Sequence, residues 1–146
     1  MAARRRALKL FLDSSVVFTA ANSPFGGSAK LFTLHDIELY VSKVVLHEVE
    51  KNVRKKLQLV QLSRFFRLVE QVIVLKGVPT ERQIQDAECV IVEKDSVILA
   101  DFCRSSCDYL ITLDKQDFLQ ESVFQFVAPK KILTPKMFFE LLDVVK

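Results

Sequence analysis

The chain has 146 residues, of which half are hydrophobic and 27% are charged, and its formal net charge is +3. This length fits one domain, residues 1–146, with a substantial core, and the composition excludes a disordered chain. The apolar runs are too short to cross a bilayer, and the basic N-terminus lacks the core of a signal peptide, so we expect a cytoplasmic protein. The three cysteines form no paired motif, which argues against a disulfide framework or a zinc site.

In the first half of the chain, short apolar strands are predicted to alternate with helices. Residues 8–12 read as a strand, after which Asp13 and the two serines that follow it are suited to cap a helix through residue 21. Ser42 is predicted to cap a long helix, because valines recur after it at every fourth position. The other predicted elements of this half are a loop at residues 22–27, a helix at 28–32, a strand at 37–41, a helix at 57–70, and a strand or helix end at 72–75.

The second half continues the alternation. Asp95 is predicted to cap a helix over residues 96–103, and Thr134 with Pro135 is the expected start of a final helix at 136–145, since proline is favoured at the first helical position. The remaining predictions are a helix at 81–92 and strands at 109–112, 123–127 and 131–133. Strands alternating with helices predict an α/β fold, a three-layer α/β/α sandwich with a central, mainly parallel sheet.

Four carboxylates lie where one predicted element gives way to the next: Asp13, Glu48, Asp95 and Asp114. In open α/β sheets the ligand crevice lies beyond the carboxyl ends of the strands, so these side chains are expected to converge. Converging carboxylates repel one another unless a cation lies among them, and Mg²⁺ and Mn²⁺ prefer oxygen ligands. The sequence therefore favours a metal-dependent enzyme.

Each acid alone has a simpler interpretation. Asp13 and Asp95 are both suited to cap helices without any catalytic role. Glu48 is also placed to pair with a neighbour on its helix, and Asp114 to form a turn. Asp117, three residues after Asp114, is a competing or assisting candidate for the fourth position. Only the set of four on one α/β frame favours the functional interpretation.

Basic residues cluster after Glu48, and three more arginines at residues 4–6 precede the first strand. The cluster consists of Lys51, Arg54, Lys55, Lys56, Arg64 and Arg67. Cations beside an acidic metal site would suit a polyanionic substrate, while a solvated helix face is the alternative.

Four segments together resemble the PIN-domain nucleases: residues 11–15, 40–50, 94–100 and 107–118. They follow the family's order and span nearly the whole chain, and the loop at residues 23–28 resembles one subset of that family. The resemblance implies the same α/β/α sandwich and endoribonuclease activity that depends on Mg²⁺ or Mn²⁺.

By position, the family's four acidic residues fall on Asp13, Glu48, Asp95 and Asp114. Three of these are expected to hold the metal: Asp13, Asp95 and Asp114. Supporting roles beside them are expected for Ser15, Thr112 and Asp117. RNA binding is expected of Lys51, Arg54 and Lys55. The small members of the family further suggest a homodimeric toxin that is held by an antitoxin protein.

Two other functions remain open from the sequence. One is a catalytically silent PIN-like module that binds RNA or protein. The other is a phosphotransfer enzyme of the haloacid-dehalogenase type, which also ends its first strand with an aspartate. That chemistry needs a second aspartate two residues after Asp13, where this chain has Ser15, so it is disfavoured.

Overall fold

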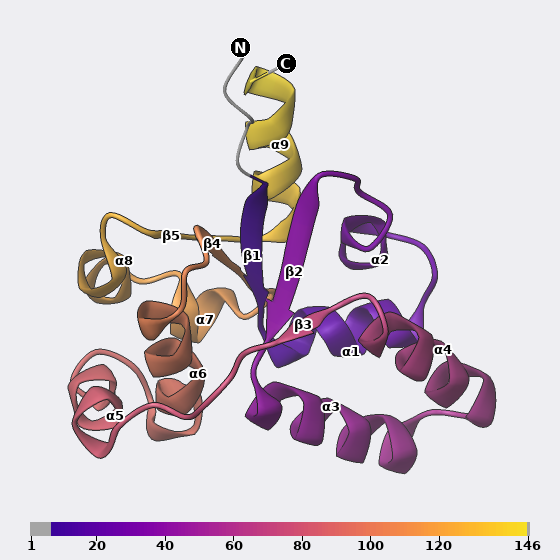
Figure 1. Cartoon of the computed structure of the whole chain (residues 1–146), viewed down its shortest axis with the longest axis horizontal. Coiled ribbons are helices and arrows are strands. Elements are labelled where there is room, and N and C mark those ends of the chain that lie inside the picture. The colour runs from indigo at the N-terminus through magenta and orange to yellow at the C-terminus, as the bar shows by residue number, and fades with distance from the viewer. Residues whose placement is uncertain (1–6, 146) are drawn as a thin grey trace.

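The computed structural model describes residues 7–145, the last two by their backbone alone, and Figure 1 shows their arrangement. The three arginines at residues 4–6 lie outside the described residues. No described helix has both the length and the apolar character needed to span a membrane.

Five parallel strands form one sheet in the order β3-β2-β1-β4-β5. The strands are β1 (Leu8–Leu12), β2 (Ile37–Val41), β3 (Ile73–Val74), β4 (Tyr109–Ile111) and β5 (Lys131–Leu133). From β1 the chain moves outward through β2 to β3, then crosses back to β4 on the other side of β1. A crevice opens where neighbouring strands connect in opposite directions, and here that point lies at the carboxyl ends of β1 and β4.

Helices cover the two faces of this sheet. They are α1 (Ser14–Asn22), α2 (Gly27–Leu31), α3 (Lys43–Lys56), α4 (Leu59–Val69), α5 (Glu81–Glu88), α6 (Glu93–Arg104), α7 (Lys115–Phe118), α8 (Glu121–Val127) and α9 (Pro135–Val145). The helices α1, α3 and α4 pack against one another, and α5 packs against α6 (Figure 1). Because parallel crossovers are right-handed, the outward and returning halves place their helices on opposite faces. The predicted α/β/α sandwich is confirmed.

The central strand β1 anchors the core. Leu10, Phe11 and Leu12 are fully buried, as expected of a parallel strand covered on both faces. The register sets Leu12 beside Ile111, and the backbone N–H of Asp13 donates to the carbonyl of Ile111 at 3.0 Å. The backbone that follows β1 is therefore held directly against the end of β4.

Two predicted helix starts are confirmed. The Ser42 hydroxyl accepts from the backbone N–H of Val45 at 3.1 Å, and the Thr134 hydroxyl accepts from that of Met137, also at 3.1 Å. These bonds satisfy N–H groups that have no partner within the helix. With Pro135 as its first residue, α9 begins where the sequence predicts.

Two predictions of secondary structure are wrong. Residues 123–127 belong to the helix α8 rather than to a strand, and their buried members, Val123 and Val127, are spaced at a helical interval. The run of β-branched and aromatic residues suggested a strand, but tertiary packing overrides such preferences. Asp95 is not a cap, because α6 begins two residues earlier at Glu93, with Val92 at the capping position.

Candidate metal centre

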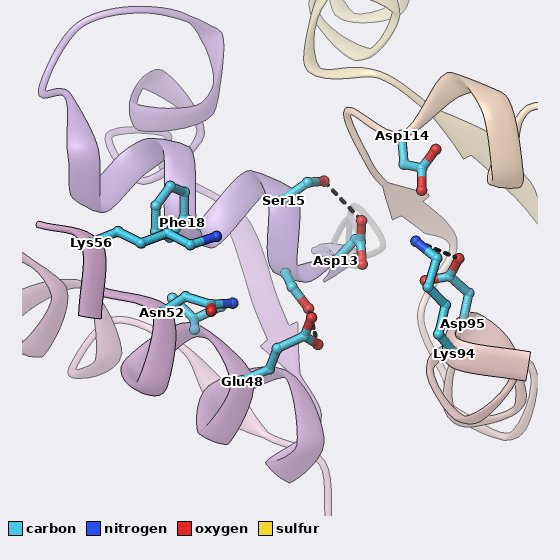
Figure 2. A pocket seen from close by; sticks show the side chains of 11 residues that line it. Asp13, Ser15, Phe18, Glu48, Asn52, Lys56, Lys94, Asp95 and Asp114 are labelled. Carbon is cyan, nitrogen blue, oxygen red and sulfur yellow. Dashed lines mark hydrogen bonds and ion pairs between the residues drawn. The ribbon is translucent and has the colours of Figure 1, made fainter. Parts of the chain in front are cut away.

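All four predicted acids line one cleft of about 250 Å³ (Figure 2). Asp13 directly follows β1, Glu48 lies in the second turn of α3, Asp95 lies in the first turn of α6, and Asp114 caps α7. These elements are distant in sequence and meet at the carboxyl edge of the sheet. The convergence expected from the alternation of strands and helices is therefore present.

A tighter group of three carboxylates lies within this region. One oxygen each from Asp95, Asp114 and Asp117 lies within 4.8 Å of the other two. Opposite ligands of an octahedral Mg²⁺ are about 4 Å apart, so one ion is within reach of all three. Asp117 thus joins Asp114 rather than replacing it. Asp13 and Glu48 line the same cleft but lie outside this group of three.

Asp13 is oriented by the two predicted hydroxyl residues. Its Oδ2 accepts hydrogen bonds from Ser15 Oγ and Thr112 Oγ1, each at 2.8 Å, and its side chain makes no capping bond. The same two hydroxyls accept from the backbone N–H groups of Leu113 and Asp114 at 3.0 Å, which fixes their position. Burial raises the pKa of Asp13, and the two hydroxyl donors oppose that rise. The capping role weighed from the sequence does not explain this carboxylate.

Asp95 and Asp117 lie close enough together that each changes the pKa of the other. Burial, followed by the hydrogen bond with Asp117, raises the pKa of Asp95 to about 7, and the ammonium of Lys94 opposes the rise. The pKa of Asp117 is lowered, chiefly by the hydrogen bond from Asp95. At neutral pH, Asp95 is therefore divided between its protonated and its charged form.

The Oδ2 atom of Asp95 is buried and has no hydrogen-bond partner. Buried carboxylate oxygens without a partner are rare, because the desolvation of a charged group is costly. An ion among the three aspartates would satisfy this oxygen. The residues present therefore fit a hard divalent cation.

Lys94 is a component of the site that was not predicted from the sequence. Its Nζ lies 3.3 Å from an Asp117 oxygen and 3.7 Å from Asp95 Oδ2. The only signal in the sequence is its position next to Asp95, and a lysine in the first turn of a helix is usually solvated. Since 72% of its side chain is exposed, its ion pairs are weak and the ammonium can be displaced.

The opposite wall of the cleft comes from α1 and α3. Glu48 Oε2 accepts from Ser14 Oγ at 2.9 Å, and Asn52, Lys56 and Phe18 continue the wall away from the carboxylates (Figure 2). Lys56 is the member of the predicted basic cluster that reaches the cleft.

The three residues predicted to bind RNA do not line the cleft. Lys51, Arg54 and Lys55 are exposed on α3, and Arg54 pairs with Glu50 at 3.1 Å. Arg64, from the same basic cluster, donates to the carbonyl of Ala21 at 2.8 Å and so ties α4 to α1. The cluster is therefore spread over several surfaces.

Replacement of Asp95 by Asn is expected to stabilise the fold above pH 7. The folded-state pKa of about 7 lies above the ordinary 3.8, so the stability that Asp95 contributes is complete below about pH 4 and is lost as the pH rises to 7. Asparagine cannot ionise, so the free energy of unfolding at pH 8 should rise by about 2 kcal/mol. Urea unfolding at pH 4 and pH 8 measures this difference.

The control for this measurement is Asp86→Asn, since Asp86 is an exposed aspartate on α5. Its stability should match the parent at both pH values. An Asp95→Asn variant that gains nothing at pH 8 would contradict the raised pKa.

Comparison with known proteins identifies a fold. The sequence matches no family model and no curated protein. Among solved structures, the chain is similar to the crystal structure of PAE2754 from Pyrobaculum aerophilum, with a TM-score of 0.63 and 14% sequence identity. The similarity covers 94% of this chain and 97% of that chain. The two proteins therefore share one fold along almost their whole lengths.

Proposed function

We propose that this chain is a divalent-metal-dependent endoribonuclease of the PIN-domain type, which hydrolyses RNA phosphodiester bonds in the acidic cleft. One observation carries the proposal: Asp95, Asp114 and Asp117 lie within reach of one ion, and a buried Asp95 oxygen accepts no hydrogen bond from the described residues and has only the exposed Lys94 ammonium near it. The likeness in fold to PAE2754 agrees with the proposal but says nothing of the reaction.

Each residue of the cleft is assigned a role in holding the metal or in orienting the attacking water. Asp95, Asp114 and Asp117 would hold Mg²⁺ or Mn²⁺, and Asp13, fixed by Ser15 and Thr112, would contact the ion or orient its water. Such an ion polarises a phosphoryl oxygen and lowers the pKa of a bound water. Glu48, held by the Ser14 hydroxyl on the opposite wall, is placed to orient the attacking water.

The proposal is tested by incubating labelled single-stranded RNA with the full chain and Mn²⁺. Internal cuts are expected with Mn²⁺ and none with a chelator. Absence of Mn²⁺-dependent cuts across a mixed-sequence RNA pool would overturn it.

A second candidate is a catalytically silent module that binds RNA or protein. The observation that favours it is Lys94, whose ammonium lies within ion-pair distance of two of the three clustered aspartates. In such a module the lysine would replace the metal permanently. In the nuclease it would be a displaceable counter-ion.

Calorimetric titration with Mn²⁺ separates these two functions. The nuclease is expected to bind Mn²⁺, and Lys94→Gln is expected to bind it roughly tenfold more tightly, because the variant loses a competing charge. Lys76→Gln removes an exposed lysine from the segment after β3 and should leave the affinity unchanged. A silent module would show no Mn²⁺ binding in the parent or in either variant.

We further propose that the chain is a cytoplasmic, homodimeric toxin that is held by an antitoxin protein. Exposed apolar side chains at the start of α4 support the homodimer, since Leu59 is 82% and Val60 is 59% exposed. Exposed apolar side chains that lie next to each other are typical of surfaces that a second protein covers.

A further inference from the structure

A second groove, of about 620 Å³, lies between the loop that precedes α2 and the first turns of α9; we call it the α2–α9 groove. Among the residues that line it are Leu113 and Lys115, which lie on either side of Asp114. The groove therefore adjoins the acidic cleft through the loop that carries one of the clustered carboxylates.

An aromatic side chain stands at the edge of the α2–α9 groove. Phe25 is 82% exposed, and its loop is held by Ser23, whose hydroxyl accepts from the Phe25 N–H at 3.2 Å. Gly26, with a φ of 99°, supplies a left-handed conformation that other residues rarely adopt. A ring held outward on a fixed loop offers a flat face at little entropic cost.

The loop is also fixed against α9. A Cβ on Gly27 would lie 3.1 Å from the Cβ of Pro135, so the glycine allows the two segments to approach closely. This contact sets the position of the loop relative to the other wall of the groove.

Three lysines line the groove, and one of them, Lys115, directly follows Asp114 of the acidic cleft. Lys115 and Lys136 make no ion pair among residues 7–143, and Lys30 lies over the ring of Phe139 at 4.6 Å from its centroid. Farther along α9, Glu140 and Asp143 line the groove instead. Attraction for an anion is therefore expected beside Lys115 and the first turn of α9, and the two carboxylates oppose it in the later turns of α9.

We propose that the α2–α9 groove binds the unpaired nucleotides that adjoin the scissile phosphate. Phe25 stacks on one base, and Lys115 and Lys136 contact the phosphates. A base within a duplex does not expose its face, so this subsite selects single-stranded RNA. The lysines beside an exposed ring favour nucleic acid over a protein partner. This inference rests on the proposed function, from which it takes the RNA substrate.

The test measures binding without cleavage, which keeps it separate from the nuclease proposal. A fluorescein-labelled octanucleotide RNA is titrated with the full chain in EDTA, alone and annealed to its complement, and anisotropy gives the affinity. The single strand is expected to bind more tightly than the duplex. Phe25→Ala should weaken single-strand binding roughly fivefold to a hundredfold, the range for losing one stacked base.

The lysines are tested by salt dependence. For single strands, log K falls with log salt by about 0.7 for each phosphate contact, so the double variant Lys115→Gln, Lys136→Gln should lower that slope by about 1.4. The matched controls are Phe66→Ala, which removes an exposed ring on α4, and Lys131→Gln, which removes an exposed lysine at the start of β5. Both controls should bind like the parent.

Equal affinity for single strand and duplex would overturn the proposal, as would parental affinity in the groove variants or equal losses in the controls. Unchanged RNA binding together with lost self-association in Phe25→Ala would assign the groove to a protein partner instead. Retained binding with no Mn²⁺-dependent cleavage would refute the nuclease and leave the groove standing.

Discussion

Asp95→Asn is expected to slow Mn²⁺-dependent RNA cleavage at least about a thousandfold, since metal stabilisation of the transition state supplies several kcal/mol and about 1.4 kcal/mol is tenfold in rate. The amide keeps the shape of the carboxylate but removes its charge and one anionic oxygen from the clustered three. Single-turnover cleavage at saturating RNA measures the loss. The loss should coincide with the gain in stability at pH 8, because the same buried charge causes both.

The matched control is Glu93→Gln, which removes a carboxylate from the same turn of α6. Glu93 is exposed, and among residues 7–145 its side chain makes no hydrogen bond or ion pair; its backbone carbonyl accepts from the Ser96 hydroxyl at 2.7 Å. Its cleavage rate should match the parent. Undiminished Mn²⁺-dependent cleavage by Asp95→Asn would remove the clustered aspartates from the reaction.

Phe102→Ala is expected to destabilise the fold by about 4 kcal/mol, the range for truncating a fully buried aromatic ring. Phe102 is 0% exposed and packs against Phe11, with 6.0 Å between ring centroids. The Nζ of Lys130 lies 4.9 Å from the centroid of the Phe102 ring and donates to the backbone carbonyl of Phe102. Chemical unfolding of the metal-free chain measures the change in free energy.

The same substitution at an exposed ring serves as the control. Phe25→Ala should leave the free energy of unfolding within about 0.5 kcal/mol of the parent, because surface changes away from special features rarely exceed that. A Phe102→Ala variant as stable as Phe25→Ala would show that the contact between β1 and α6 does not anchor the core.

The position of the acids followed from the sequence because each lies at or near the boundary of an element. Asp13 and Asp114 come just after the buried strands β1 and β4, and parallel strands bring their carboxyl ends to one edge. Alternation of strands and helices alone was enough to predict that convergence. Ser15 and Thr112 followed from the resemblance and lie beside Asp13 as expected.

The finer geometry of the site was not accessible from the sequence. The role of Asp117 depends on α7, whose four residues are too few to show a helical period. The contact of Lys94 with two aspartates depends on α6 beginning at Glu93, and the apolar Val92 at the capping position gives no signal of that start. Which lysines line a groove is set by packing between distant segments, as with Gly27 and Pro135.

The strand order also fixes when the cleft can exist during synthesis. Asp13 and Glu48 belong to the half of the chain that ends with β3, whereas Asp95, Asp114 and Asp117 all come later. Within the sheet the two halves meet along one pair of strands, β1 and β4. A nascent or prematurely released chain that stops before residue 109 lacks that seam and carries at most one of the three clustered aspartates. Ribosomes that abandon the message early thus release fragments in which the three aspartates cannot cluster.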